Sequence, residues 1–473
     1  MRAGLAGGAL RGAAALLLVA ASAGCSLLSL DILQDGEGGG APTTSSSGGG
    51  EATTSSAGGG GTGGAGVGGG SGPGGGGAGG EGGGEVGPCG KFDMLRDDFE
   101  SQASTQRYFG LGQAKVQGGA LVAEHATVGA STQYIAAYSL HTYDLRDSAV
   151  AVRAVEVTNA TTGYVETFFR VALGNSYVHI AKVGTQLRFA RDTAGDYQQI
   201  GAITYDPVLH AHWRMRESAG TFYFETSPDG TGWTVRAQTA SSALLPLELL
   251  NLELGSYYET PGANPGRARF DELRGDTATA GPACKLTTLQ DDFDRSSEAT
   301  LWRRSSDDPG CKHAYVDGRL QFDFTDGESG YCFLRSSRLY DLSASAISLR
   351  AVEVTAPGKT AETYVELRAV GGDAVLVVGN GNLLILGRKP AGGSTEQIFS
   401  TAYLPSEFAY WRLRESNGSV LLETSANGTS FTERAQTQLD FDPSRVEVIL
   451  GAGTWNDPID VGKVRLDDLN ILP

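Results

Sequence analysis

The residues of this chain that could do chemistry are arginines and glutamates on a predicted β-hairpin. Ser218-Ala-Gly-Thr221 is suited to a two-residue turn. Counting outward from it places Arg214 opposite Glu225 and Arg216 opposite Tyr223. Guanidinium groups beside a tyrosine on one sheet face could hold hydroxyl or carboxylate groups of a ligand. The alternative is a cross-strand ion pair that contributes about 1 kcal/mol at most.

A second hairpin repeats this arrangement. Ser416-Asn-Gly-Ser419 is typical of a type I′ turn and places Arg412 opposite Glu423 and Arg414 opposite Leu421. The residues that alternate with these arginines are apolar in both hairpins, so that face should belong to the core. Leucine in place of tyrosine weakens the case for a shared aromatic platform. The candidate binding face consists of Arg214, Arg216, Tyr223, Glu225, Arg412, Arg414 and Glu423.

Residues that could bind a metal ion give a weaker signal. His210-Ala-His212 corresponds to Phe408-Ala-Tyr410 in the second copy, so the position requires bulky planar side chains and not ligands. Asp97-Asp98 recurs as Asp291-Asp292, which fits either a calcium site or capping of strand ends. We predict no metal site and no cofactor, with calcium as the open alternative.

These residues lie in a domain that the chain contains twice. Tyr143 to Thr158 returns as Tyr340 to Thr355, about 197 residues later. Both copies consist of short segments in which β-branched or aromatic residues alternate with polar ones, bounded by Gly, Asn, Asp or Pro. This pattern predicts an all-β protein with little helix. We expect two tandem antiparallel jelly-roll β-sandwich domains of the same topology, over 89–280 and 281–473.

Several motifs recur in both copies and resemble a known family. They are an Asp-Asp-Phe opening, a Val-x-x-Gly-x-Leu strand at Val116–Leu121 (one residue shorter at Val316–Leu320), the Trp-Arg-x-Arg-Glu-Ser hairpin, and a closing Phe270-Asp-Glu-Leu273 or Leu466-Asp-Asp-Leu469. Together they resemble the concanavalin A-like lectin/glucanase superfamily, the jelly-roll group that includes laminin-G-like modules. The resemblance covers both copies. It implies the fold more than any one function.

Glycoside hydrolases on this fold carry closely spaced carboxylates, and retaining chemistry needs the two carboxyl groups about 5–5.5 Å apart. The expected Glu-x-Asp-x-x-Glu motif is absent from the sequence. The nearest candidates are Glu156, Glu166, Glu353, Glu362 and Glu366. Ion pairing within the sheet, for example near Arg153 or Arg350, explains such glutamates without catalysis. We therefore expect a non-catalytic protein, with a divergent glycoside hydrolase or polysaccharide lyase as the alternative.

The N-terminal residues predict export and a lipid anchor. Two arginines and a short apolar run precede Ala21-Ser-Ala-Gly-Cys25, and the run is too short to span a bilayer. Residues 1–25 resemble a bacterial lipoprotein signal with Cys25 as the lipidated residue, although a leucine is usual where Ser22 stands. The alternative is an ordinary cleaved signal peptide. Residues 26–88 are rich in Gly and Ser and predict a disordered linker.

The remaining cysteines fit an oxidising compartment. Cys89 and Cys284 stand at equivalent places at the beginning and just beyond the end of the first copy, so a bridge between them is expected. Cys311 and Cys332 flank a strand region of the second copy and should form a second bridge. Neither pair has metal-ligand spacing.

The formal net charge of −17 argues against nucleic acid as a partner. We expect an exported lipoprotein, anchored to the cell envelope at the outer membrane or cell surface, whose tandem domains bind glycans or other extracellular polymers. Two linked modules would raise avidity if both can engage. A structural or protein-interaction surface module is the other alternative. The sequence does not identify a ligand.

Overall fold

The computed structural model describes residues 89–92, 95–125, 132–159, 163–259, 266–276, 283–294, 301–304, 308, 310–355, 361–454 and 462–473. The predicted signal segment 1–25, with Cys25, and the predicted linker 26–88 lie outside these residues. Within the described residues, no helix is both long and apolar enough to cross a membrane.

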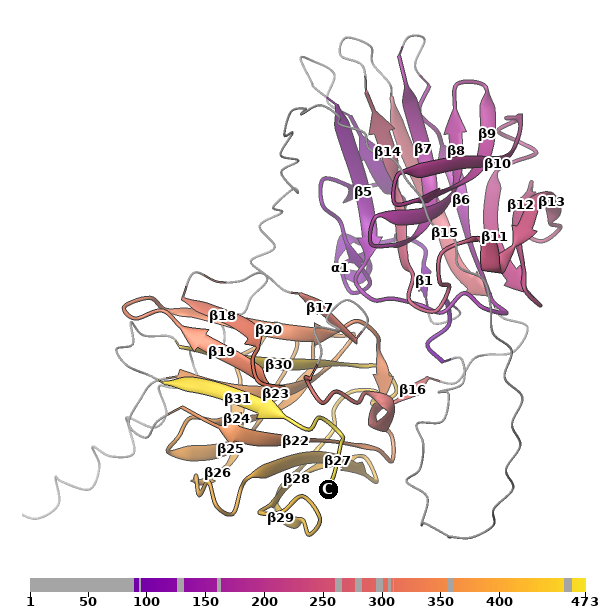
Figure 1. Ribbon diagram of the computed structural model, residues 1–473. Helices are drawn as coiled ribbons and strands as arrows, with labels where there is room; N and C mark the ends of the chain where they lie inside the picture. Colours follow the sequence, from indigo (N-terminus) through magenta and orange to yellow (C-terminus); the bar gives the residue numbers. More distant parts are fainter. Residues whose placement is uncertain are drawn as a thin grey trace, which may run out of the picture. The chain divides into compact units, whose positions relative to one another are not determined.

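The first repeat consists of two sheets (Figure 1). Sheet 1 has eight strands in the order β13-β12-β11-β6-β15-β4-β3, with β1 paired to β15. Its strands are β1 (Arg96–Asp97), β3 (Lys115–Val116), β4 (Leu121–Glu124), β6 (Ala149–Glu156), β11 (His212–Ser218), β12 (Thr221–Ser227), β13 (Thr234–Ala240) and β15 (Arg267–Asp276). Sheet 2 has seven strands in the order β10-β9-β8-β7-β14-β5-β2. These are β2 (Phe109–Gly110), β5 (Gln133–Ser139), β7 (Val165–Leu173), β8 (Ser176–Val183), β9 (Gln186–Thr193), β10 (Asp196–Thr204) and β14 (Asn251–Tyr258).

The second repeat also consists of two sheets. Sheet 3 has nine strands in the order β16-β21-β30-β23-β24-β25-β26, and β20 joins β17 to β30. Its strands are β16 (Cys284–Lys285), β17 (Trp302–Arg304), β20 (Gly330–Ser336), β21 (Tyr340–Asp341), β23 (Ala361–Ala369), β24 (Ala374–Gly379), β25 (Leu383–Lys389), β26 (Glu396–Ala402) and β30 (Val446–Thr454). Sheet 4 has seven strands in the order β18-β19-β31-β22-β27-β28-β29. These are β18 (Cys311–Tyr315), β19 (Leu320–Phe324), β22 (Ala346–Glu353), β27 (Tyr410–Ser416), β28 (Ser419–Ser425), β29 (Thr432–Gln438) and β31 (Lys463–Asp467).

The two repeats share one topology, as the duplication predicted. Sheets 1 and 4 have equivalent strand orders, and so do sheets 2 and 3 apart from the added β16 and β21. In the first repeat the chain passes from one sheet to the other after β1, β2, β4, β5, β6, β10, β13 and β14, which is how a jelly roll is wound. All pairings between these strands are antiparallel except the short β16–β21 pair. The predicted all-β fold with two jelly-roll sandwiches is therefore confirmed. The described helix α1 (Gln102–Thr105) has four residues.

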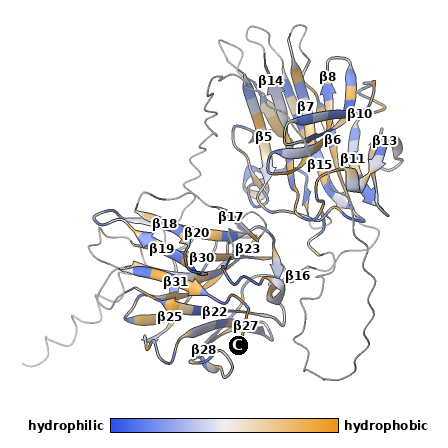
Figure 2. Ribbon diagram, in the orientation of Figure 1, coloured by the Kyte–Doolittle hydropathy of each residue, from blue (hydrophilic) through white to orange (hydrophobic). Residues whose placement is uncertain are grey.

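The core of each repeat lies between its two sheets. In the first repeat, Trp213 and Phe222 of sheet 1 pack in one buried cluster with Phe169 and Phe189 of sheet 2. Hydrophobic and hydrophilic residues alternate along the strands (Figure 2), because successive side chains point to opposite faces. The arginines of β11 therefore lie on the outer face of sheet 1.

Both predicted hairpins have the predicted turn and register. Ala219 and Gly220 have φ angles of 50° and 79°, and Asn417 and Gly418 have 52° and 80°. Positive φ at both central residues defines a type I′ turn. Arg214 pairs with Glu225, and Arg412 with Glu423.

Both predicted disulfides form. The Cα atoms of Cys89 and Cys284 are 5.0 Å apart, and those of Cys311 and Cys332 are 5.5 Å apart. The structure also shows which parts of the fold each bridge joins. Cys284 belongs to β16 of sheet 3, so the first bridge joins the openings of the two repeats. Cys311 and Cys332 lie on β18 and β20, so the second bridge joins the two sheets of the second repeat.

Candidate functional site

The predicted binding face holds a buried ion pair in each repeat. Arg214 Nε donates to Glu225 over 2.6 Å, and Arg216 donates to the same carboxylate over 2.9 Å. Only 3% of the Glu225 side chain is exposed. Arg216 lies over the Tyr223 ring, 4.1 Å from its centroid, so this tyrosine is half-buried. The pair is therefore part of the sheet's packing.

The second repeat has the same geometry. Arg412 and Arg414 donate to Glu423 over 2.6 and 2.9 Å, and Arg412 stacks on Phe431 at 3.8 Å. Burial raises the pKa of Glu423, but the two arginines outweigh burial and hold it below its usual value. Leu421 takes the place of Tyr223, so the shared element is the ion pair and not an aromatic surface.

A different face of the first repeat combines exposed aromatic rings with buried charges. On the outer face of sheet 2, Tyr134 and Tyr138 of β5 are 47% and 46% exposed, and Tyr197 of β10 is 45% exposed. Between them, Arg170 of β7 pairs with His179 of β8 and with Glu253 of β14. We call this surface the tyrosine face.

A buried carboxylate lies at its centre. Glu166 accepts hydrogen bonds from Arg170 over 3.0 Å and from the Tyr164 hydroxyl over 2.8 Å. His179 Nδ1 lies 3.2 Å from the same carboxylate. Burial by itself would raise the pKa of Glu166, but His179, Arg170 and Tyr164 lower it to about 2. Glu166 is therefore ionised at neutral pH and does not act as a general acid.

His179 is the least satisfied polar group of this cluster. Its side chain is 2% exposed, Nδ1 faces Glu166, and Nε2 has no hydrogen-bond partner among the described residues. Burial lowers its pKa against the opposing effect of Glu166. The rings of Tyr177 and Tyr197 lie 5.1 and 6.0 Å from the imidazole.

Arg170 is fixed between aromatic rings and two carboxylates. Its guanidinium lies 3.9 Å from the Phe168 centroid and 4.3 Å from that of Tyr177. Glu253 is 4.0 Å away and accepts a 2.7 Å hydrogen bond from the Tyr134 hydroxyl. Tyr134 thus presents its ring to solvent while its hydroxyl is held, which makes the ring a rigid platform.

The matching face of the second repeat has a different character. Arg368 pairs with Glu447 as Arg170 pairs with Glu253. Around them, Tyr364, Leu376, Val378, Ile385 and Ile449 form a buried apolar cluster. By strand register, Ala374 stands where the first repeat has His179. No exposed tyrosine occurs on the described part of this face.

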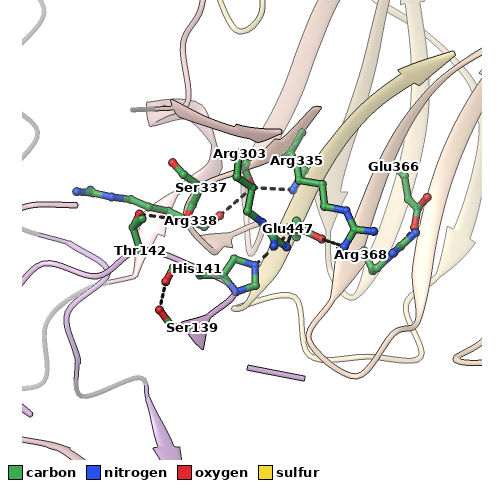
Figure 3. Close-up of polar contacts among 12 residues, drawn as sticks. Ser139, His141, Thr142, Arg303, Arg335, Ser337, Arg338, Glu366, Arg368 and Glu447 are labelled. Carbon is green, nitrogen blue, oxygen red and sulfur yellow. Dashed lines mark hydrogen bonds and ion pairs between the residues drawn. The ribbon is translucent and has the colours of Figure 1, made fainter. Parts of the chain in front are cut away.

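A side chain of the first repeat contacts this second face. Figure 3 shows His141, Arg303 and Arg335 converging on Glu447. The His141 imidazole lies 3.5 Å from the Glu447 carboxylate, Arg335 lies 3.7 Å from it, and Arg303 donates to it. Burial raises the pKa of Glu447, but these cations and the His141 contact hold it well below its ordinary value. The Glu447 carboxylate at the polar end of the second face is therefore already paired within the protein.

The remaining candidate carboxylates are paired or inaccessible. Glu156 accepts from Arg267 over 2.9 Å and Glu353 lies 3.4 Å from Arg465, so their partners are on neighbouring strands and are not Arg153 or Arg350. Glu362 and Glu366 are both buried on β23. Their backbones are four residues apart, roughly 13 Å along a strand, where a retaining pair needs carboxyl groups about 5–5.5 Å apart.

The histidines and aspartates considered as metal ligands have partners within the protein. His210 Nδ1 accepts a backbone hydrogen bond from Asp206, and His212 lies 3.4 Å from Glu272. Asp97 and Asp291 accept from the backbone N–H groups two residues later. This is the capping role that the sequence offered beside calcium. The described residues contain no group of three or more side chains arranged to hold a metal.

Comparison with known proteins gives a likeness of fold. No protein-family model and no curated protein matches the chain. A prokaryotic β-1,3-1,4-glucanase (lichenase) derived from a mouse hindgut metagenome is similar at 11% identity and a TM-score of 0.29, over 38% of this chain and 95% of that one. A laminarinase from Flavobacterium sp. UMI-01 is similar at 10% identity and a TM-score of 0.31, over 38% of this chain and 96% of that one. A legume lectin-like domain from Entamoeba histolytica is similar at 9% identity and a TM-score of 0.29, over 38% of this chain and 94% of that one. At these identities and TM-scores the likeness concerns the fold alone.

Of the predicted site residues, the structure brings Arg214, Arg216, Tyr223 and Glu225 together on sheet 1. It brings Arg412, Arg414 and Glu423 together on sheet 4. The tyrosine face was not predicted from the sequence, apart from Glu166 as a candidate carboxylate. A signal was present in Tyr164-Val-Glu-Thr-Phe-Phe-Arg170, where aromatic and charged residues alternate with Val, Thr and Phe. Such alternation identifies an outward face but not its neighbours.

Proposed function

We propose that this chain is a non-catalytic, surface-anchored lipoprotein whose first sandwich domain binds glycans or other extracellular polymers on the tyrosine face. The observation that carries the proposal is the set of exposed rings, Tyr134, Tyr138 and Tyr197, around the buried Glu166–Arg170–His179 cluster. Aromatic rings stack on sugar rings, while a few fixed polar groups orient the hydroxyls.

The lipoprotein part of the proposal rests on the sequence ending in Cys25 and on the Gly-rich segment after it. The two disulfides fit an exported protein. The proposed location is therefore the cell envelope, where the protein is lipid-anchored at the outer membrane or cell surface.

A binding role is favoured over catalysis by the state of the carboxylates. Glu166 is held ionised by an arginine, a histidine and a tyrosine. Glu362 and Glu366, on the second repeat, are buried away from any substrate. A hydrolase needs an accessible acid and a second carboxylate beside it.

A glycan array probed with the mature protein tests this function. Tyr138→Ala and Tyr197→Ala should each weaken binding by about tenfold, since a buried aromatic contact in a site is worth more than 1 kcal/mol. Val235→Ala is the matched control, because Val235 is also 45% exposed but lies on sheet 1. Binding that both tyrosine variants leave unchanged would place any ligand elsewhere and favour a protein-interaction role.

A further inference from the structure

A hollow of the first repeat lies on sheet 1, on the opposite side of the sandwich from the tyrosine face. Its volume is about 380 Å³. Arg214 of β11 and Arg274 of β15 both pair with Ala151 of β6, one from each side. Their backbones are therefore roughly 10 Å apart. The small side chain of Ala151 forms a floor between two guanidinium groups.

The walls supply an aromatic ring and backbone groups. Arg214 lies 4.2 Å from the centroid of Trp233, which is half-buried, and Arg274 donates to the carbonyl oxygen of Gly230. Thr231 and Asp276 stand exposed at the rim. A volume of this size is at the lower end of small-molecule sites, which suits a single ring.

The charges around the hollow leave a positive excess. Among the residues that line the hollow, Arg214 and Arg274 carry two positive charges and Asp276 carries one negative charge, an excess of one positive charge. Glu225 is buried against its arginines, whereas the Asp276 side chain is 63% exposed and 3.8 Å from Arg214. Asp276 is thus the anion that an incoming carboxylate would displace.

The second repeat provides an internal comparison. There Ser348 replaces Ala151, because both pair with the matching arginine. Asn470 exchanges hydrogen bonds with the Ser348 backbone, and its amide donates to two carbonyl groups of residues 286 and 289. The second guanidinium group and the open floor are therefore features of the first repeat.

We infer that this hollow binds the carboxylate of an acidic sugar residue between Arg214 and Arg274, with the sugar ring beside Trp233. Arginine forks match carboxylate geometry and make short charge-assisted hydrogen bonds. The site is independent of the tyrosine face and of the function proposed for it. Its ligand class is set by the charge of Arg214 and Arg274.

Titration of the mature protein with glucuronate, glucose and acetate tests the inference. Glucuronate should bind, glucose should bind at least tenfold more weakly, and acetate should bind more weakly than glucuronate because it lacks the ring. Arg274→Ala should weaken glucuronate binding by about 10- to 100-fold, the loss expected for charged hydrogen bonds. Asp276→Asn should strengthen it, because the competing carboxylate is removed while an exposed side chain of the same size remains.

Arg412→Ala is the matched control, since it removes an arginine from the same ion pair in the repeat without the hollow. It should leave glucuronate binding unchanged. Wild-type affinity of Arg274→Ala, or equal binding of glucose and glucuronate, would overturn the assignment. If Arg274→Ala unfolds, Asp276→Asn decides alone, and affinity that does not rise in that variant refutes a carboxylate at this position. Loss of neutral glycan binding in the tyrosine variants, with glucuronate binding intact, separates this site from the proposed function.

Discussion

Two buried glutamates show how partners decide what a carboxyl group does. Glu166 has a guanidinium, an imidazole and a phenol within hydrogen-bonding distance, and its pKa falls to about 2. Glu362 has the Tyr331 hydroxyl at 3.5 Å, and burial raises its pKa to about 8. The first is a fixed anion and the second a neutral acid at pH 7. Their stability effects should therefore have opposite pH dependence.

Glu166→Gln should lose stability on the order of 3 kcal/mol near neutral pH. The pKa of Glu166 drops from 4.5 to about 2 on folding, so its contribution is present above pH 4.5 and is lost as the pH falls through 2. Urea unfolding at pH 7 and pH 3 should show the difference from wild type shrinking. Glu156→Gln, which removes an exposed carboxylate paired with Arg267, should change little at either pH.

Glu362→Gln should have the opposite profile. The pKa of Glu362 rises from 4.5 to about 8 on folding, so its stabilising effect is present below pH 4.5 and is lost as the pH rises through 8. The variant should therefore be more stable than wild type at pH 9 by a few kcal/mol and nearly equal to it at pH 5. A wild-type protein whose stability does not fall between pH 5 and pH 9 would show that Glu362 is not held neutral by burial.

At the scale of the element, the hairpins were the most predictable part. A turn of two residues with positive φ fixes which residues face each other, and period-two alternation then assigns each side chain to a face. Trp213 in the core and Arg214 outside it follow from these two rules, and the structure confirms both. The Cys89–Cys284 pair was predictable from the duplication, and the Cys311–Cys332 pair from the strand region that these two cysteines flank.

The tyrosine face was not predictable, because it depends on pairing between distant strands. Tyr138 of β5, Glu253 of β14 and Arg170 of β7 become neighbours only through the strand order of sheet 2. Alternation within one strand says that a side chain points outward, but a turn sets register only between consecutive strands. The hollow on sheet 1 likewise needs β15 beside β6.

The two turns offer a matched stability test. Ala219 and Asn417 occupy the same turn position, with φ angles of 50° and 52°. Asparagine tolerates this left-handed region better than alanine does. Ala219→Asn should therefore raise the free energy of unfolding by up to about 1 kcal/mol, and Asn417→Ala should lower it similarly. Thermal unfolding would measure both, and changes of equal sign would contradict the argument.

At the scale of the whole chain, duplication has preserved the fold and let the two faces diverge. The Arg–Glu pair of the hairpin is the same in both repeats. The tyrosine face of the first repeat corresponds in the second to an apolar, buried cluster whose polar end contacts His141. Features that differ between the copies are those available for function, while the shared ones maintain the sandwich.

This divergence predicts one site for neutral glycans in each chain, on the tyrosine face, beside the acidic-sugar site inferred on sheet 1. Isothermal titration of the mature protein with a glycan selected on the array should give a stoichiometry near one. Tyr138→Ala combined with Tyr197→Ala should abolish the binding, because the second repeat has no exposed tyrosine on the described part of its matching face. Leu376→Ala, a change in the buried second-repeat cluster, should lower stability by about 2–5 kcal/mol without changing the stoichiometry. Two sites per chain for a neutral glycan, or binding that survives the double tyrosine variant, would show that a face other than the tyrosine face also binds it.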